Sequence, residues 1–358
     1  MTSGSQPAAV DRQRPQAGSQ LGVVHLVRRA NGLEPFRGFL DSYRRHAGGV
    51  EHELVLVLKG FDEPRSSEPY RELAEDLAAG WLSVPDDGFD LGAYRHAAAA
   101  LAHHRLLLLN SFSVILADGW LDLLAAAARA PRVGAVAASG SWGSQSSHLR
   151  YGLGLGGPYK GVFADRRSTD GVFAELAELA AGAQPAGDAE SPRGAQSASS
   201  AESLGGAADQ PRRKPIGTGI EIVRTMARQG VCFPAFPSPH LRTNGLLIER
   251  ARWLRVCARA PRDKLAAHRL ESGRGGITAR LRAEGMEAVV VGRDGHSYDA
   301  EEWPASRTFW QGDQENLLIG DNQTRAYHDG DALRRRVLAG YAWGPSGAPS
   351  EPARAVPA

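Results

Sequence analysis

Short apolar runs alternate with helix-like segments over the first 142 residues, and this alternation leaves few folds open to the chain. Residues 21–29 and 52–61 are runs of the kind that form buried strands. Three further strand-like runs lie at 81–87, 105–112 and 133–142. Helical spacing fills the intervals, at 33–47, 66–80, 91–105 and 115–130. The pattern predicts a doubly wound α/β fold with a mostly parallel central sheet, whose strands end on one ligand-binding edge.

Three polar segments interrupt the pattern. They lie at 1–20, 180–214 and 346–358. Each is dominated by small, polar or Pro residues and cannot bury enough apolar surface to order itself. We expect disordered tails at both ends and a disordered surface insertion in the middle. The remaining 21–345 should form one domain, with 21–142 as its first half and 215–345 as the second half and smaller C-terminal extension.

The charge balance and the cysteines bear on location and partners. Lys and Arg total 42 against 40 Asp and Glu, a net charge of +2, which does not indicate a nucleic-acid-binding surface. Cys232 and Cys257 lie far apart and in no Cys-x-x-Cys pair, as expected for reduced thiols. No apolar run approaches the roughly 20 residues that span a bilayer, and the N-terminus lacks the apolar region of a secretory signal. We therefore expect a cytoplasmic protein that does not bind nucleic acid.

The loop after the third run is acidic and rich in glycine. Asp86, Asp87 and Asp90 fall within five residues, with Gly88 among them and Gly92 two residues after the last. Glycine lets backbone approach a ligand closely, and the following helix offers free amides at its N-terminus. Such a loop, with Tyr94 one turn further on, could hold a ribose or sugar hydroxyl and a diphosphate. The alternative is plain helix capping by Asp90, which accounts for one carboxylate but not for three.

Polar side chains also follow the other strand-like runs. Asn110 and Ser111 end the fourth run, where they either face a ligand or form an ordinary polar strand end. Arg28 and Lys59 end the first two runs and could face a diphosphate, although basic residues are common on surfaces. Asp118 either belongs to this site or caps the helix that follows it.

The second half supplies candidates for a general base. Glu271 lies at a glycine-rich break in a helical region, where a ligand would find room. His240 and Asn244 flank the start of an apolar strand. The simpler interpretation of Glu271 is a pair with His268 on a solvated helix face.

Two segments resemble a known family of enzymes. DDGFDLGAYRHAAAA at 86–100 and LLLLNSFSVILADGWLDLL at 106–124 resemble the rhamnan-synthesis-type and family 2 glycosyltransferases. The resemblance implies a GT-A fold and transfer of a hexose or deoxyhexose from a nucleotide-diphosphate-sugar donor to a glycan or lipid-linked acceptor, as in bacterial polysaccharide or glycoconjugate synthesis. The first half would bind the donor and the second half the acceptor. A lipid-linked acceptor would bring the protein to the inner face of the membrane as a peripheral partner.

The resemblance also implies roles for individual residues. Arg28 and Lys59 would lie near the nucleotide, Asp87 and Asp90 near the ribose or donor sugar, and Asn110 near the diphosphate or a metal ion. The metal-binding Asp-x-Asp usual in the family is absent at 110–112. A Mn or Mg cofactor therefore remains an open expectation, with Asp87 and Asp118 as candidate ligands.

The mechanism that we expect is direct transfer, in which a carboxylate takes the proton of the attacking hydroxyl. Glu271 is the first choice of base and His240 the second. A non-catalytic homologue that only binds nucleotide-sugars is the alternative, favoured by the missing acid pair. A dinucleotide-binding Rossmann enzyme is disfavoured, because no Gly-x-Gly-x-x-Gly follows the first run.

Overall fold

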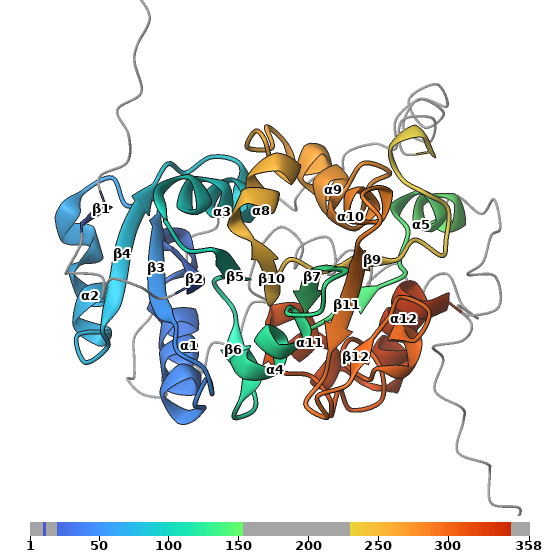
Figure 1. Ribbon diagram of the computed structural model, residues 1–358. Helices are drawn as coiled ribbons and strands as arrows, with labels where there is room; N and C mark the ends of the chain where they lie inside the picture. Colours follow the sequence, from blue (N-terminus) through green and yellow to red (C-terminus); the bar gives the residue numbers. More distant parts are fainter. Residues whose placement is uncertain (1–9, 12–19, 153–229, 345–358) are drawn as a thin grey trace, which may run out of the picture.

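The computed structural model describes residues 10–11, 20–152 and 230–344 (Figure 1). The predicted insertion at 180–214, the C-terminal tail and most of the N-terminal tail lie outside the described residues. Val10 and Asp11, which fall within the predicted tail, form a short strand β1 that pairs antiparallel with β4.

A single nine-stranded sheet forms the centre of the molecule, in the order β1-β4-β3-β2-β5-β10-β7-β11-β12, which runs from left to right in Figure 1. The strands that point one way are β2 (Leu21–Arg28), β3 (Glu53–Lys59), β4 (Ala79–Val84), β5 (Arg105–Leu109), β7 (Val133–Ala137) and β11 (Glu287–Val291). The strands that oppose them are β1 (Val10–Asp11), β10 (Leu246–Glu249) and β12 (Ser297–Tyr298). The doubly wound, mostly parallel sheet predicted from the sequence is confirmed.

One feature of the sheet was not predicted. Strand β10 comes from the second half of the chain, yet it lies between β5 and β7 and runs antiparallel to both. Leu246 pairs with Leu108 on one side and with Ala137 on the other. The two halves of the chain therefore share one sheet and the hydrophobic clusters on both of its faces.

Helices cover both faces of this sheet, because successive strand residues point to opposite sides and both sides are apolar. Val23 and Val27 of β2 pack on one face, and Val24 and Leu26 on the other. The first face is covered by α1 (Leu33–Arg45), α2 (Glu68–Leu73), which follows a short turn η2 (Pro64–Ser67), and α4 (Trp120–Ala127). The second is covered by α3 (Phe89–Ala100), α8 (Arg250–Val256), α10 (Ile277–Ala283) and α12 (Ala332–Trp343).

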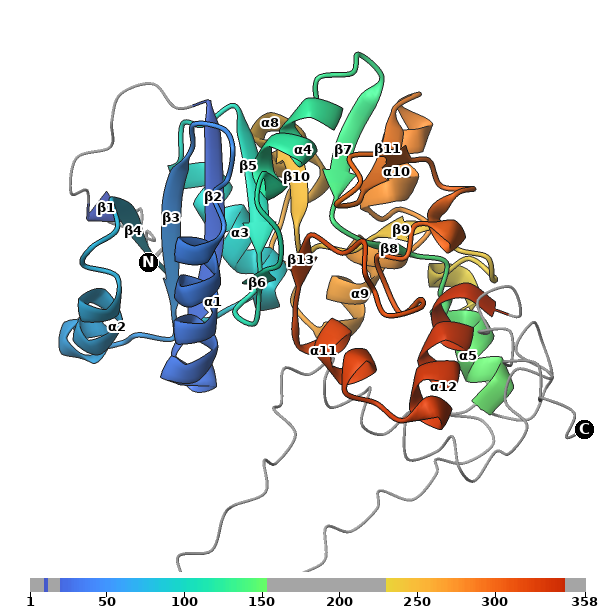
Figure 2. The same ribbon diagram turned by 90° about the horizontal axis from the view of Figure 1, so that it is seen from below.

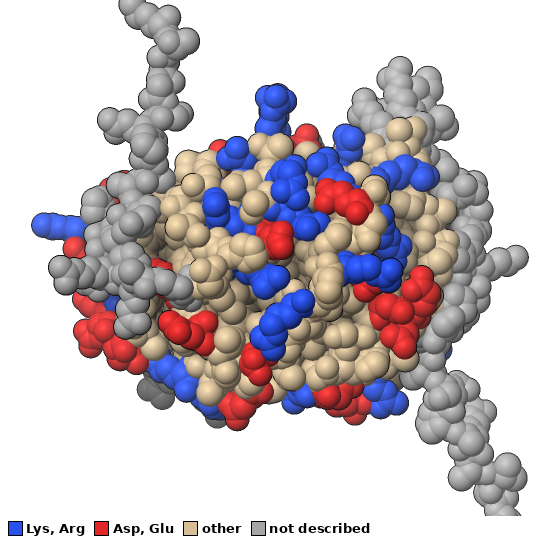
Figure 3. All heavy atoms as spheres, viewed as in Figure 1, with Lys and Arg blue, Asp and Glu red and all other residues tan. Residues whose placement is uncertain are grey.

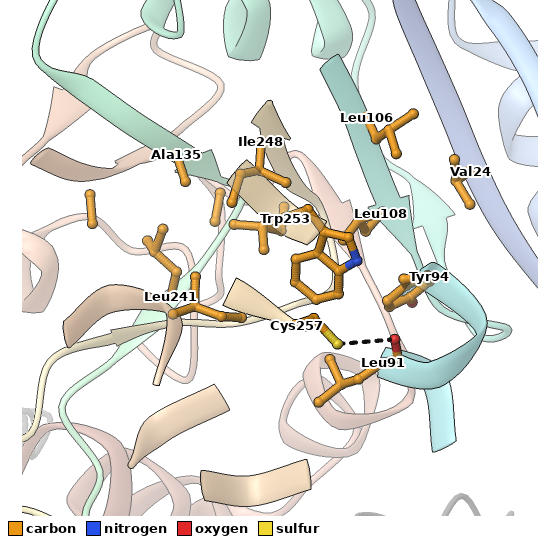
Figure 4. Close-up of a cluster of buried hydrophobic side chains, with 14 of the residues drawn as sticks. Val24, Leu91, Tyr94, Leu106, Leu108, Ala135, Leu241, Ile248, Trp253 and Cys257 are labelled. Atoms are coloured by element: carbon orange, nitrogen blue, oxygen red, sulfur yellow. Dashed lines mark hydrogen bonds between the residues drawn. The ribbon is translucent and has the colours of Figure 1, made fainter. Parts of the chain in front are cut away.

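Trp253 of α8 fills the centre of the second face (Figure 4). It is fully buried, and its ring meets Tyr94 edge-on with the centroids 6.3 Å apart. Cys257 lies beside it, with its Sγ 3.8 Å from the carbonyl oxygen of Leu91. Both Cys232 and Cys257 are free thiols, as expected.

Smaller elements connect the sheet to the C-terminal extension. Two short pairs, β6 (Val114–Ile115) with β13 (Ile319–Gly320) and β8 (Gly140–Ser141) with β9 (His240–Leu241), join distant parts of the chain. The remaining elements are η1 (Arg29–Asn31), α5 (Gln145–Gly152), α9 (Lys264–Ser272), η3 (Trp303–Ala305) and α11 (Asn322–His328). Figure 2 shows α12 beside α5, where Tyr341 and His148 meet with ring centroids 4.8 Å apart.

Across the described ranges, no helix is both long and apolar enough to cross a membrane.

A buried histidine on β2 yields a testable prediction. His25 is fully buried and stacks on Phe39 at 3.6 Å, and neither ring nitrogen has a hydrogen-bond partner among the described residues. Burial lowers the pKa of His25 to about 3. The folded protein thus keeps this ring neutral, whereas the unfolded chain takes up a proton below about pH 6.5, so the histidine costs stability as the pH falls through that value.

We expect His25→Leu to raise the free energy of unfolding by about 1–2 kcal/mol at neutral pH, because an unpaired buried polar ring is removed. The difference in unfolding free energy between His25→Leu and the wild type should grow by up to about 1.4 kcal/mol per pH unit below pH 6. Urea unfolding at pH 7.5 and 5.5 measures the gain in stability and its growth with falling pH. The control is the same substitution at an exposed histidine, His104→Leu. A stability difference that stays the same at the two pH values would contradict this explanation.

Candidate functional site

A cavity of about 650 Å³ opens at the carboxyl edge of the sheet. From β2 the chain winds outward through β3 and β4, then returns to place β5 on the other side of β2. Such a reversal of winding leaves a crevice where open α/β sheets bind ligands. Residues predicted for the site that line this cavity are Arg28, Lys59, Asp86, Asp87, Asp90, Asn110, Ser111 and Glu271.

Lys59 fixes the acidic loop to the end of β3. Its side chain is buried, and Nζ donates hydrogen bonds to the carbonyl oxygens of Asp87 at 2.9 Å and Phe89 at 2.6 Å. The carboxylate of Asp86 lies 3.7 Å away. Burial lowers the pKa of Lys59, and the charges of Asp90 and Asp86 oppose that effect. A buried ammonium group is tolerated only with such partners, so Lys59 holds the shape of the loop.

Two glycines let the acidic loop fold back on α3. Gly88 adopts a left-handed φ of 63°, and its carbonyl accepts a hydrogen bond of 2.7 Å from the amide of Gly92. A Cβ at Gly92 would lie 2.7 Å from the carbonyl oxygen of Asp87, closer than two such atoms can approach. Phe89 also has a positive φ, 57°, and is 45% exposed at the cavity. This strained backbone presents an aromatic ring and the first amides of α3 to the cavity.

The carboxylate of Asp90 lies among several charged groups. Burial raises its pKa, the charges of Lys59 and Arg28 lower it, and the charge of Glu271 raises it. Tyr94, one turn along α3, does not line the cavity but lies buried beneath it. Its hydroxyl has no hydrogen-bond partner among the described residues, and burial raises its pKa well above the ordinary value.

The polar end of β5 is held from behind by Asn244. The amide of Asn110 and the hydroxyl of Ser113 donate to the side-chain oxygen of Asn244, at 3.1 and 2.6 Å. Asn244 itself is buried, does not line the cavity, and donates to the carbonyl of Gly320 at 3.3 Å. The structure therefore places Asn244 as a support for Asn110 rather than at the cavity surface.

A buried ion pair closes this side of the site. Arg242 donates to Asp321 at 2.8 Å, and Asn110 approaches the same carboxylate oxygen at 3.4 Å. Burial raises the pKa of Asp321, but the charge of Arg242 and the hydrogen bonds that cap α11 outweigh it, so the pKa is lowered. The capped helix then places Asn322 and Gln323 at the cavity.

One face of α9 forms the opposite wall. Lys264, Ala267, His268 and Glu271 line the cavity at the spacing of a single helix face. Glu271 Oε1 accepts hydrogen bonds from the amide and the hydroxyl of Thr243, at 3.2 and 2.9 Å. These two hydrogen bonds fix the orientation of the Glu271 carboxylate. Glu271 is therefore not simply one member of a charged pair on a solvated helix face. Burial lowers the pKa of His268, while the charge of Glu271 raises it.

Besides Tyr94 and Asn244, two further predicted residues, His240 and Asp118, lie outside the cavity lining. His240 Nδ1 lies 2.8 Å from the carbonyl oxygen of Ser238, and burial lowers the pKa of its ring, against the charge of Glu271. Asp118 accepts a hydrogen bond of 3.1 Å from the amide of Ala47, in the turn that leads from α1 into the start of β3. That turn belongs to the amino edge of the sheet, opposite the cavity.

In the described part of the chain, no three His, Cys, Asp or Glu side chains converge to hold an ion. Asp87 lies 3.1 Å from His96, and Asp118 is at the other edge of the sheet, so the two predicted ligands do not share a site. Asp87 and Asp118 therefore cannot bind one Mg²⁺ or Mn²⁺ ion together.

Several lining residues were not predicted from the sequence. They are Asn31, Phe89, Phe112, Arg262, Asn322 and Gln323. A signal existed for two of them, because Asp321-Asn-Gln-Thr324 forms a capping box that begins a helix. Asn31, Phe89 and Phe112 belong to the segments that follow the predicted strand ends, whereas Arg262 reaches the cavity through tertiary packing that no local pattern specifies.

No family model and no curated protein matches the sequence. Among solved structures, the mannosyltransferase PcManGT from Pyrobaculum calidifontis, in complex with GDP-Man and Mn²⁺, is 16% identical over 37% of this chain and 39% of that chain, with a TM-score of 0.29. S. aureus TarS 1-349 in complex with UDP-GlcNAc is 14% identical over 33% of each chain, with a TM-score of 0.28. The chain thus spans less than two fifths of either structure. At these TM-scores the similarity assigns no function to this chain.

The packing of Gly92 against Asp87 gives a prediction about the site. Gly92→Ala should displace the acidic loop, because the new methyl group meets backbone rather than a flexible side chain. We expect faster hydrogen exchange of the amides of 86–92 and a loss of about 1–3 kcal/mol in unfolding free energy. Gly38→Ala in α1 is the control, since nothing lies within 4 Å of its Cβ. Unchanged exchange at 86–92 would contradict the close packing.

Proposed function

We propose that this protein is a glycosyltransferase that uses a nucleotide-diphosphate-sugar donor. The observation that carries the proposal is the convergence of the loop 86–90, the strand end at Asn110 and the oriented Glu271 on one cavity. Carboxylates suit sugar hydroxyls, and cations suit a diphosphate, and this cavity contains both kinds of group.

The donor's diphosphate is the anionic part of the ligand. Arg28, Arg262 and Lys264 line the cavity, and Nε of Arg28 has no hydrogen-bond partner among the described residues. The N-terminus of α3 adds backbone amides near the same place. We assign the ribose or the sugar hydroxyls to Asp86, Asp87 and Asp90, with Lys59 shaping the loop that presents them.

We assign the role of general base to Glu271. An acceptor hydroxyl oxygen attacks the anomeric carbon and forms the new glycosidic bond, while the bond from that carbon to the diphosphate breaks. The electron pair of the broken bond leaves with the diphosphate, whose charge the cationic side chains stabilise. The hydroxyl proton passes to Glu271, which Thr243 holds in place. His240, the second choice, is less suited because it lies outside the cavity lining.

The finer assignments belong to the same proposal. The sugar would be a hexose or deoxyhexose, and the acceptor a glycan or a lipid-linked molecule in bacterial polysaccharide or glycoconjugate synthesis. The reaction would take place in the cytoplasm, at the inner face of the membrane when the acceptor is lipid-linked.

A second candidate function is binding of a nucleotide-sugar without turnover. It is favoured by the strand end Asn110-Ser111-Phe112, where neutral groups take the place of an acid pair. A panel of nucleotide-sugars, incubated with the protein with and without Mn²⁺, separates the two functions. Release of free nucleoside diphosphate supports the transferase, and binding of a donor with no release from any of them supports the binding protein.

Substitutions of the acidic loop test the donor site. Asp87→Ala and Asp90→Asn should each weaken donor binding by about 10–100-fold, because each removes a charged hydrogen-bond acceptor for a hydroxyl. Asp118→Asn, at the opposite edge of the sheet, should change the affinity by less than about twofold. Isothermal titration with the preferred donor measures all three. Equal effects at the three positions would contradict the assignment.

Glu271→Gln tests the base. We expect kcat to fall by about 10²–10⁴-fold while donor affinity stays close to that of the wild type, since the amide keeps the shape but cannot take the proton. Thr243→Val should lower kcat by a smaller factor, because it removes one of the bonds that orient the carboxylate. A Glu271→Gln enzyme with unimpaired kcat would refute the assignment of this residue.

A further inference from the structure

Basic side chains are concentrated in one stretch of the second half. Residues 250–283 contain ten Lys and Arg against two Asp and Glu, whereas the whole chain has a net charge of only +2. Figure 3 shows Lys and Arg side chains gathered across the upper part of the view, where Figure 1 places α8, α9 and α10. The even overall balance therefore conceals a local excess that the composition alone did not indicate.

The cations belong to one continuous surface. Arg280 of α10 donates to the carbonyl oxygen of Val256 at the end of α8, at 3.2 Å, and to that of Gly275 at 2.7 Å. The neighbouring amide of Arg274 donates to the carbonyl of Cys232 at 2.9 Å. We call the exposed side chains of this surface the basic strip: Arg255, Arg259, Arg269, Arg274 and Arg280.

Apolar side chains lie exposed within the same surface. Val231 is 75% exposed beside Arg274, whose Nη2 lies 3.5 Å from the carbonyl oxygen of Gly230. Leu265 is 39% exposed on α9, one turn before Arg269. Cations combined with exposed aliphatic residues suit a membrane interface, where the charges meet headgroups and the apolar groups enter the acyl boundary.

The strip adjoins the mouth of the cavity. Helix α9 carries Arg269 and Leu265 on its exposed side and Lys264, His268 and Glu271 on its cavity side. We propose that the basic strip docks this protein on an anionic lipid bilayer, so that an acceptor at the membrane surface reaches Glu271. The access of an acceptor to Glu271 rests on the function proposed above, whereas the docking on the bilayer does not.

Nucleic acid is the other polyanion that such a surface could attract. Proteins that bind single strands without sequence preference stack bases on exposed aromatic rings. The sole aromatic residue in 250–283 is Trp253, which is fully buried. The exposed aliphatic residues favour the bilayer instead.

Vesicle flotation with the full chain tests the proposal. Vesicles of phosphatidylcholine alone are compared with vesicles that also contain phosphatidylglycerol. We expect binding to the anionic vesicles, little to the neutral ones, and a steep loss of binding at high salt. Each basic residue at such a surface contributes about fivefold to binding, so Arg255→Glu, Arg259→Glu and Arg269→Glu combined should weaken it on the order of 100-fold.

A matched control makes the same change in net charge elsewhere. Arg45→Glu, Arg65→Glu and Arg129→Glu combined alter three exposed arginines at elements of the other face of the sheet, and should leave vesicle binding within about threefold of the wild type. Absence of binding to anionic vesicles, or equal losses in the two triple variants, would overturn the proposal. RNA bound as tightly as the vesicles, and released by the strip variant alone, would overturn it as well.

The same variants keep this inference separate from the proposed function. The strip variant should retain the wild-type rate of donor turnover with a soluble acceptor, because none of its three positions lines the cavity. Donor turnover without vesicle binding would refute only the docking. Vesicle binding that the strip variant loses, in a protein that turns over no nucleotide-sugar, would support the docking and count against the transferase.

Discussion

The register of the parallel strands is the constraint on which the site depends. Arg28 at the end of β2 pairs directly with Lys59 at the end of β3, and Lys59 pairs with Val84 at the end of β4. On the other side of β2, His25 pairs with Leu109, the last residue of β5. Parallel pairing thus brings four strand ends to one edge, and a shift by one residue would turn their side chains to the opposite face. The buried ammonium group of Lys59 then fixes the acidic loop at this edge, because it donates hydrogen bonds to the carbonyl oxygens of Asp87 and Phe89.

Local patterns in the sequence predicted the frame of the fold and the parts of the site that lie at strand ends. Apolar runs and helical spacing are short-range signals, so Arg28, Lys59 and Asn110 could be assigned to one edge before any tertiary contact was known. Helix ends were less well predicted: the segment 66–80 forms a helix only to Leu73, and Ala79 and Gly80 already belong to β4. Tertiary pairing overrides propensity at such boundaries.

Contacts between distant segments could not be predicted. Arg242 and Asp321 are 79 residues apart, and Asn110 and Asn244 are 134 apart, yet both pairs support the same strand end. Strand β10, whose apolar residues predicted a strand, gave no indication that it would lie antiparallel between β5 and β7. Tyr94 was predicted at the ligand from its place after the acidic loop, but helix periodicity turns it into the core beneath Asp90.

The two walls of the cavity suggest a division of tasks in the proposed reaction. The first half of the chain contributes the acidic loop for the donor, and α9 contributes Glu271 together with a cationic outer surface. In the proposed reaction, a donor in the cavity and an acceptor at a membrane surface would then approach the same carboxylate from different sides. Thr243, in the turn between β9 and β10, holds this carboxylate in place through two hydrogen bonds to Glu271.

A crystal structure of the protein grown with the nucleotide-sugar that it turns over is the most direct test of this account. We predict that the sugar hydroxyls will contact Asp87 or Asp90, that the diphosphate will lie against Arg28 and the first turn of α3, and that the Glu271 carboxylate will face the anomeric carbon. A donor bound at the amino edge of the sheet, or one in the cavity with Glu271 turned away from its anomeric carbon, would contradict it.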